Sequence, residues 1–151
     1  MTWPADMFGI ILAVVLGGVI GLERELSGKV AGMRTNIMIC LGAAIFTVVS
    51  RQLGLGSDDS TTRISAQIVS GVGFLGAGAI IQDRGGIFGL TTAATIWLVA
   101  AVGMACGAHY FGLAAVTTGT GILVLVGLRR VENMLRRARE QKHGTDSQRQ
   151  Q

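Results

Sequence analysis

The stretch ISAQIVSGVGFLGAGAII, residues 64–81, carries no formal charge and has seven small residues between Ser70 and Ala79. A water-soluble helix avoids this much glycine, because each interior glycine costs about 1 kcal/mol relative to alanine. A membrane helix tolerates it, since helices in lipid associate through close backbone packing and interhelical hydrogen bonds, and small residues permit both. The stretch therefore predicts a transmembrane helix in a tightly packed bundle.

The same letters match the dinucleotide-binding pattern G-x-G-x-x-G at Gly71, Gly73 and Gly76. That pattern indicates a dinucleotide-binding site only where it follows a strand and opens a helix, with an acidic residue about 20 positions further on. The next acidic residue here is Asp83, seven positions past Gly76. The membrane interpretation is therefore favoured over a nucleotide-binding fold.

The composition agrees with a membrane protein. Half of the 151 residues are apolar and only 15% are charged, against roughly 25% charged in soluble domains. The charged residues are grouped, and the intervals between the groups approach the ~20 apolar residues that cross a bilayer. We therefore predict one all-α membrane domain over residues 1–128, with five transmembrane helices at about 3–22, 35–50, 64–81, 89–106 and 110–128. The second of these is short enough to be a buried or re-entrant segment instead.

The basic residues predict the orientation. If the N-terminus faces outward and the C-terminus inward, eleven of the 13 basic residues lie on the cytoplasmic side, and only Arg51 and Arg63 lie outside. The positive-inside rule favours this arrangement. Residues 129–142 repeat apolar side chains at helical spacing between basic ones, which predicts an amphipathic helix on anionic lipid or a solubilising end of the fifth helix. Residues 143–151 are expected to be disordered. The basic segment has no aromatic residue, so nucleic acid is not an expected partner.

This orientation brings four polar or glycine-rich chain ends to the cytoplasmic face. Helices that begin near Thr35 and Thr91 would turn their partially positive N-termini to this face, which favours an anion. Two acidic side chains, Glu23 and Glu25, offer oxygen ligands for Mg²⁺, the one cofactor we consider. The cluster is therefore an ion-pair network, a ligand site or a partner surface. Its predicted members are Glu23, Arg24, Glu25, Arg34, Thr35, Asn36, Thr91 and Thr92.

A second group of candidate residues lies inside the predicted third span. We expect its polar members to face inward around Phe74, either bonding across helices or lining a pathway. The absence of an ionisable side chain at mid-depth in any predicted span argues against a coupled carrier. The pairs Gly17–Gly21 and Gly103–Gly107 have the GxxxG spacing that permits close helix contacts within one chain or in a homodimer. The predicted intramembrane packing residues are Gln67, Ser70, Gly71, Gly73, Gly76 and Gly78.

The sequence does not indicate an enzyme. Its two histidines, His109 and His143, fall in a predicted outer loop and in the tail. No serine has a histidine and a carboxylate at the same face, so a hydrolytic constellation is not expected. Two cysteines, Cys40 and Cys106, lie within predicted spans and are expected to be packing residues.

Four motifs together resemble the MgtC/SapB family of bacterial inner-membrane proteins: GLERE at 21–25, GMRTN at 32–36, IVSGVGFLGAGAII at 68–81 and GLTTAATIWLVAAVG at 89–103. The resemblance implies a multi-pass helical domain in the bacterial inner membrane, a link to magnesium limitation and, in pathogens, survival inside macrophages. It further implies regulation of membrane energetics through contact with ATP synthase rather than magnesium pumping. Many virulence-linked members carry a soluble domain after the last span, whereas this chain ends 23 residues past Leu128. We therefore expect a short form without that domain.

Taken together, the residues and the resemblance predict a non-enzymatic inner-membrane protein linked to Mg²⁺ homeostasis. It is expected to contact lipid, a membrane partner such as ATP synthase, and a second copy of itself. The alternative is a transporter or channel for a small ion, either Mg²⁺ or an anion.

Overall fold

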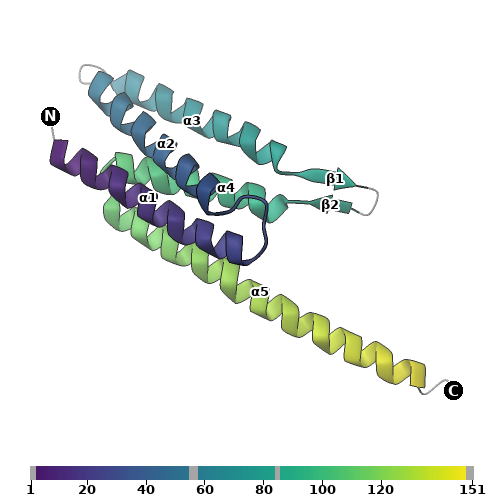
Figure 1. The fold of residues 1–151 in the computed structure, drawn as a ribbon. Coiled ribbons are helices and arrows are strands. Elements are labelled where there is room, and N and C mark those ends of the chain that lie inside the picture. The colour runs from purple at the N-terminus through teal and green to yellow at the C-terminus, as the bar shows by residue number, and fades with distance from the viewer. Residues whose placement is uncertain (1–2, 55–57, 84–85, 149–151) are drawn as a thin grey trace.

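The computed structural model describes residues 3–54, 58–83 and 86–148. Five helices run back and forth along a common direction, and one short hairpin lies between the third and fourth (Figure 1). In chain order the elements are α1 (Trp3–Leu26), α2 (Met33–Leu53), α3 (Asp58–Gly78), β1 (Ile81–Asp83), β2 (Gly86–Phe88), α4 (Leu90–Gly107) and α5 (Phe111–Gln148). The prediction of five helices in one bundle is confirmed, and the hairpin is an addition to it.

Four of the described helices are long and apolar enough to cross a membrane: α1, α2, α4 and the Phe111–Val131 part of α5. Helix α3 runs from Asp58 to Gly78. It begins at Asp58, six residues before the predicted third span, so its first turns are rich in polar residues. It ends at Gly78, before the predicted end, and the chain then enters strand β1. The predicted end of the third span is therefore wrong, whereas its predicted start lies inside the helix.

The hairpin sets the position of the α4 N-terminus. Strands β1 and β2 are antiparallel, with Ile81 opposite Phe88 and Asp83 opposite Gly86. Gly89 follows at a φ of 91°, in the left-handed region that favours glycine. A Cβ at this position would stand 2.1 Å from the carbonyl oxygen of Ala79. Only glycine therefore lets the chain fold back this closely on the end of α3 and start α4 beside it.

The centre of the bundle is the contact of α2 with α1 and α4. A Cβ added at Gly17 or Gly21 of α1 would lie 2.7 Å from Cys40 or Met33 of α2. A Cβ at Gly103 or Gly107 of α4 would lie 2.1 or 2.4 Å from backbone carbonyl oxygens of α2. Such spacing brings helix backbones together and increases dispersion contacts, which drive association in lipid. Both GxxxG pairs thus lie in contacts within one chain.

The two cysteines belong to the same core. Cys40 and Cys106 are free thiols with no exposed surface, packed among Ala13, Ile20 and Val99. Their environment is apolar, as expected for packing residues.

Helix α3 packs through a different face from the expected one. Its buried positions are Ile68, Val72 and Gly76, which recur every fourth residue; Ile68 and Val72 pack with residues of both α2 and α4, and Gly76 lies beside Ala93 of α4. Phe74, by contrast, is 81% exposed. The expectation that polar residues cluster inward around Phe74 is therefore wrong for the single chain. The β-branched side chains of Ile68 and Val72 fill the contact with α2 and α4 and leave most of the glycines of α3 exposed. The residues on that outward face include Gln67, Ser70, Gly71, Gly73 and Gly78.

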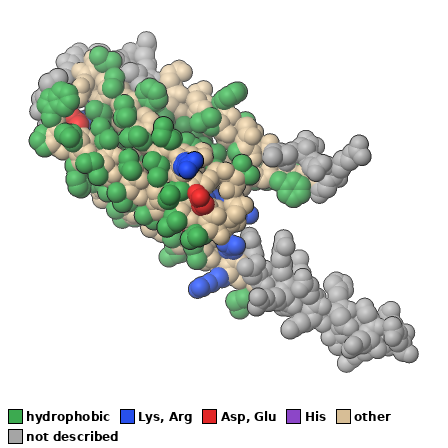
Figure 2. Space-filling view, viewed as in Figure 1, with side chains coloured by type: hydrophobic (Ala, Val, Ile, Leu, Met, Phe, Trp, Pro, Cys, Tyr) green, Lys and Arg blue, Asp and Glu red, His purple; other side chains and the backbone are tan. Residues whose placement is uncertain are grey.

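Helix α5 extends well beyond the bundle and carries the basic segment (Figure 1). It is continuous to Gln148, and residues 149–151 lie outside the described part of the chain. No helix boundary falls at 128 or 142, and the division of the chain at these positions stays a prediction. Apolar side chains cover most of the visible bundle, and most of the visible charged side chains lie at the end from which α5 emerges (Figure 2).

Candidate functional site

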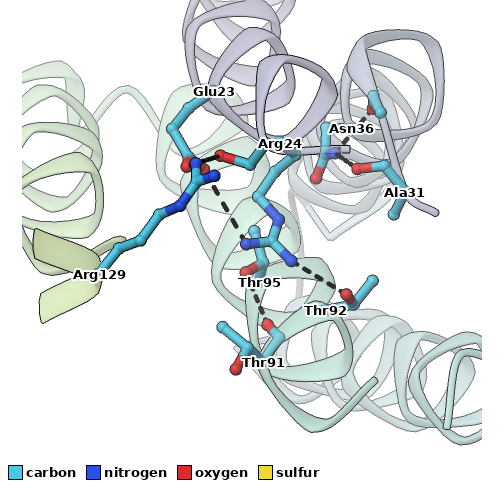
Figure 3. Close-up of polar contacts among 10 residues, drawn as sticks. Glu23, Arg24, Ala31, Asn36, Thr91, Thr92, Thr95 and Arg129 are labelled. Atoms are coloured by element: carbon cyan, nitrogen blue, oxygen red, sulfur yellow. Dashed lines mark hydrogen bonds and ion pairs between the residues drawn. The ribbon is translucent and has the colours of Figure 1, made fainter. Parts of the chain in front are cut away.

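The polar residues predicted to converge lie at one end of the bundle, which we call the hairpin end because it carries β1 and β2 (Figure 1). The last turn of α1, the first turn of α2 and the first turn of α4 all reach this end. Figure 3 shows their polar side chains together with Arg129 of α5. Of the four chain ends that the sequence predicted at this face, those of α1, α2 and α4 bring polar side chains to the group, and the structure adds Arg129 of α5.

Arg24 is the centre of the group. Its side chain leaves α1 toward α4, and only 2% of the residue is exposed (Figure 3). Its Nη2 donates a hydrogen bond of 3.0 Å to Oγ1 of Thr92, and its Nη1 lies 4.0 Å from a carboxylate oxygen of Glu23. Its Nε has no hydrogen-bond partner within the described part of the chain. A buried guanidinium needs such partners, because an uncompensated buried charge costs several kcal/mol, on the order of 3–5. Arg24 thus ties the end of α1 to the start of α4.

Glu23 extends the network toward α5. Ser27 donates a hydrogen bond of 2.6 Å to Oε1 of Glu23, and Arg129 in turn donates one to the hydroxyl of Ser27. Oε2 of Glu23 is buried and accepts no hydrogen bond from the described residues, and it is the oxygen that lies 4.0 Å from Nη1 of Arg24. The sequence reasoning did not place Ser27 in the site and counted Arg129 only for orientation. The signal for Ser27 was its position one turn after Glu23, which is hydrogen-bonding distance on a helix.

Two other predicted members hold the turn between α1 and α2. Glu25 accepts a hydrogen bond of 2.8 Å from the backbone N–H of Met33 and so caps α2, whose N-cap residue Gly32 has no side chain to do so. Asn36 is fully buried and donates from Nδ2 to the carbonyl oxygens of Ala31 and Gly32, each at 2.8 Å. Both side chains therefore shape the local backbone.

The remaining predicted members do not join the buried network. Arg34, Thr35 and Thr91 are exposed, and the described contact of Thr91 is a backbone one, from the hydroxyl of Thr95 at 2.7 Å. The hairpin-end network is therefore Glu23, Arg24, Ser27, Thr92 and Arg129, with Glu25 and Asn36 holding the turn beside it.

A magnesium site is not supported by the donors at this end. Among the described residues, no three or more His, Cys, Asp or Glu side chains are placed to hold a metal ion together. Glu23 lies beside Arg24, and Glu25 is engaged with the N-terminus of α2. A hard cation such as Mg²⁺ requires several converging oxygen ligands, and these two carboxylates have other partners.

A second polar cluster lies at the opposite end of the bundle, and the sequence reasoning missed it. The carboxylate of Asp6 on α1 is 95% buried and lies 2.8 Å from Nε2 of His109 and 3.1 Å from Nη1 of Arg51. The same Nη1 donates to the carbonyl oxygen of Gly107 at 2.8 Å, and Gln52 reaches the other oxygen of Asp6 at 3.4 Å. These contacts join α1, α2 and the turn between α4 and α5.

The backbone of His109 gives this cluster its particular geometry. His109 has a φ of 67°, the one non-glycine residue with positive φ in the described chain. It follows the C-cap of α4, and the next residue, Tyr110, donates its N–H to the carbonyl oxygen of Ala105 at 2.8 Å. Helices commonly end this way with glycine, and a side chain in this conformation is strained. The predicted topology put Asp6, Arg51 and His109 on the same, outer side of the membrane. That common side was the one signal in the sequence from which the cluster could have been predicted.

Comparison with known proteins places the chain in a family. The family model described as "MgtC family" matches residues 10–134. The chain belongs to the MgtC family. Protein MgtC of Brucella abortus (strain 2308) is 51% identical to it over 106 residues, which cover 70% of this chain and 44% of that protein. Protein MgtC of Salmonella typhimurium (strain 14028s) is 44% identical over 112 residues, covering 74% and 47%.

A further relative has a descriptive name. YhiD of Escherichia coli (strain K12), named as a candidate magnesium transporter, is 45% identical over 124 residues, covering 77% of this chain and 57% of that protein. No solved structure matches this chain. The chain spans about half the length of the curated relatives it matches. The four apolar helices and the bacterial relatives indicate a bacterial membrane protein.

Proposed function

We propose that the chain is a non-enzymatic protein of the bacterial inner membrane, linked to adaptation to low Mg²⁺, that acts through contacts of its helices with membrane partners. The observation that carries the proposal is the use of the hairpin-end network. Arg24 of α1 bonds to Thr92 of α4, and Arg129 of α5 bonds to Ser27, which in turn bonds to Glu23, so the network ties helices of the same chain together. ATP synthase and a second copy of the chain are the proposed partners, and the membrane lipid is the proposed surroundings.

The distribution of buried charge favours this proposal over transport. The charged side chains that the structure describes as buried are Asp6, in the first turn of α1, and Arg24, in its last turn, so they lie at opposite ends of the bundle. Between them, α1, α2 and α4 approach through glycines without space for a Cβ. Coupled carriers place ionisable groups along a pathway at mid-depth, and a pathway needs space that this contact does not leave.

Transport remains the second candidate because the relative YhiD is named as a candidate magnesium transporter. Proteoliposomes with a fluorescent Mg²⁺ indicator inside test it directly. We expect the wild-type chain to give the same Mg²⁺ and anion flux as empty liposomes. A flux above that background that disappears in Glu23→Gln, but persists in the exposed-site control Arg34→Gln, overturns the proposal in favour of transport.

A growth test examines the proposed link to low Mg²⁺. In a bacterium that lacks its own copy, the chain is expected to restore growth at micromolar Mg²⁺ and to leave growth at millimolar Mg²⁺ unchanged. Crosslinking in those cells followed by detection of ATP synthase subunits tests the named partner. Restored growth without any crosslinked membrane protein contradicts action through partner contacts, and unrestored growth contradicts the link to low Mg²⁺.

A further inference from the structure

At the end of the bundle opposite the hairpin, Arg51 and His109 share one buried carboxylate oxygen. Oδ1 of Asp6 lies 3.1 Å from Nη1 of Arg51 and 2.8 Å from Nε2 of His109. The two nitrogens are themselves 3.2 Å apart. The three groups thus form a triangle that joins α1, α2 and the turn after α4, and its two nitrogens face each other as well as the carboxylate.

The protonation of His109 decides how this triangle is bonded. A neutral imidazole has one N–H and one bare nitrogen, so Nε2 either donates to Asp6 or accepts from Arg51 and cannot do both. In the charged ring both nitrogens carry a proton, so Nε2 can only donate. Histidine is the side chain whose charge ordinarily changes between pH 5 and 8. Acid therefore commits His109 to Asp6 and places a second positive charge beside Arg51.

The distances show what that second charge does to Arg51. The Coulomb energy of two charges falls inversely with their separation. Nη1 of Arg51 is 3.1 Å from the negative oxygen of Asp6 and 3.2 Å from the nitrogen of His109. Because these distances are nearly equal, a charge on His109 cancels most of the attraction between Arg51 and Asp6. His109 lies closer to Asp6, at 2.8 Å, and keeps a net attraction to it.

The backbone determines which of the two cations gives way. The N–H groups of His109 and Tyr110 donate to the carbonyl oxygens of Cys106 and Ala105, at 3.2 and 2.8 Å, so the turn holds the imidazole in place. Arg51 instead reaches the triangle through a long side chain that is 30% exposed. Its other bond within the cluster is to a carbonyl oxygen at 2.8 Å, which water can replace at an exposed edge. Arg51 is therefore the side chain that turns to water.

The other elements at this end bring no described charge to the imidazole. Helix α5 faces it with the ring of Phe111, whose centroid is 5.6 Å away. The first turns of α3 carry three charged residues whose side chains lie outside the described part of the chain, namely Asp58, Asp59 and Arg63. Among the described residues, the balance at His109 is therefore set by Asp6 and Arg51.

We propose that Asp6, Arg51 and His109 form a proton-responsive latch. At neutral pH, Arg51 binds Asp6 and the carbonyl oxygen of Gly107 and so ties the last turn of α2 to α1 and α4. In acid, His109 takes Asp6, Arg51 leaves, and the last turn of α2 is freed. In the predicted orientation this end faces outward, so the latch responds to acid outside the membrane. The inference does not rest on the proposed function, which uses the opposite end of the bundle.

Hydrogen exchange at the last turn of α2, residues 50–53, measures the latch in bicelles. Dividing by the intrinsic rates removes the direct effect of pH on exchange. The wild-type amides should then exchange faster at about pH 5 than at about pH 8, by roughly two- to fivefold, as for a partly exposed ion pair. Equal rates at the two pH values in the wild type overturn the proposal.

Two histidine variants identify the titrating group. His109→Asn keeps an amide donor and a residue that tolerates the left-handed backbone, but it does not titrate, so the pH difference should disappear. His143→Asn removes the other histidine of the sequence and should leave the difference unchanged. A difference that survives His109→Asn, or that disappears in His143→Asn, contradicts the latch.

Arg51→Gln tests the latch even if His109→Asn does not fold. A neutral glutamine is not repelled by the imidazolium, so the last turn of α2 should exchange equally at both pH values. If protonation of His109 acted only on its own turn, the pH difference would persist in Arg51→Gln, and that result contradicts the proposal. Arg34→Gln, an exposed arginine at the other end of α2, is the matched control and should behave as the wild type. Failure of the low-Mg²⁺ growth test would affect only the proposed function, because exchange does not depend on it.

Discussion

The contact between His109 and Asp6 allows a stability prediction with two separable terms. Replacing His109 by alanine removes a hydrogen bond to a buried carboxylate while the backbone stays at a φ of 67°. Replacing it by glycine removes the same hydrogen bond and also relieves the strain of a side chain in the left-handed region. The two variants therefore differ only in the strain and in the greater freedom of glycine in the unfolded chain.

The magnitudes follow from the geometry. A hydrogen bond to a charged group contributes about 1.5–3 kcal/mol, and Asp6 keeps its contact with Arg51 at 3.1 Å, so His109→Ala should cost about 1.5–3 kcal/mol. A side chain in the left-handed conformation costs roughly 1–2 kcal/mol, so His109→Gly should cost about 1 kcal/mol less than His109→Ala.

The assay is reversible unfolding in bicelles or mixed micelles, followed by circular dichroism. A double-mutant cycle of His109→Ala with Asp6→Asn should return a coupling energy of about 1 kcal/mol or more, since the two residues are in contact. The reasoning is refuted if His109→Ala is as stable as the wild type, if glycine is worse than alanine at this position, or if the cycle shows no coupling.

Three further results are expected. Thr92→Val should destabilise the bundle by about 1–3 kcal/mol, because it leaves a buried donor of Arg24 unpaired, and the exposed Thr91→Val should be near neutral in the same unfolding assay. Glu25→Ala should remove the cap on α2 and cost about 0.5–2 kcal/mol; faster hydrogen exchange at the start of α2 would localise the effect, and unchanged exchange would contradict it. Gly103→Ala should lower the melting temperature, because its Cβ would lie 2.1 Å from the carbonyl oxygen of Cys40. The control Gly73→Ala, with nothing within 4 Å of its Cβ, should not lower it. Equal melting temperatures of the two variants would contradict the close α2–α4 contact.

Much of the helical architecture could be predicted from the sequence because the bilayer imposes length and polarity directly on the chain. Apolar runs bounded by charges located α1, α2, α4 and the first part of α5. The start of the third helix was harder to predict, because the helix begins at Asp58, in a polar segment that precedes the apolar stretch. Segment polarity predicts which residues cross a membrane, and it does not predict where the hydrogen-bonded helix begins or ends.

The candidate site was predicted in part for a similar reason. Topology alone brings the ends of α1, α2 and α4 together, so Glu23, Arg24 and Thr92 were expected as neighbours. Which of them is buried depends on the rotation of each helix about its own axis. Arg24 is buried and Arg34 is exposed, although both are arginines that the sequence predicted at the same face of the membrane.

The sequence by itself determined that this chain is a helical membrane protein of the MgtC family, because hydropathy and family motifs are properties of consecutive residues. Only the tertiary structure decided what its glycines and polar residues do. The glycine-rich stretch at 64–81 contributes one buried glycine, Gly76, to packing on α4, while Gly71 and Gly73 face outward. The pairing of Asp6 with His109, 103 positions away, likewise depends on tertiary contacts. The physical reason is the same in both cases, because helix rotation is set by side-chain packing between segments far apart in the chain. For α3, Ile68 and Val72 pack with α2 and α4.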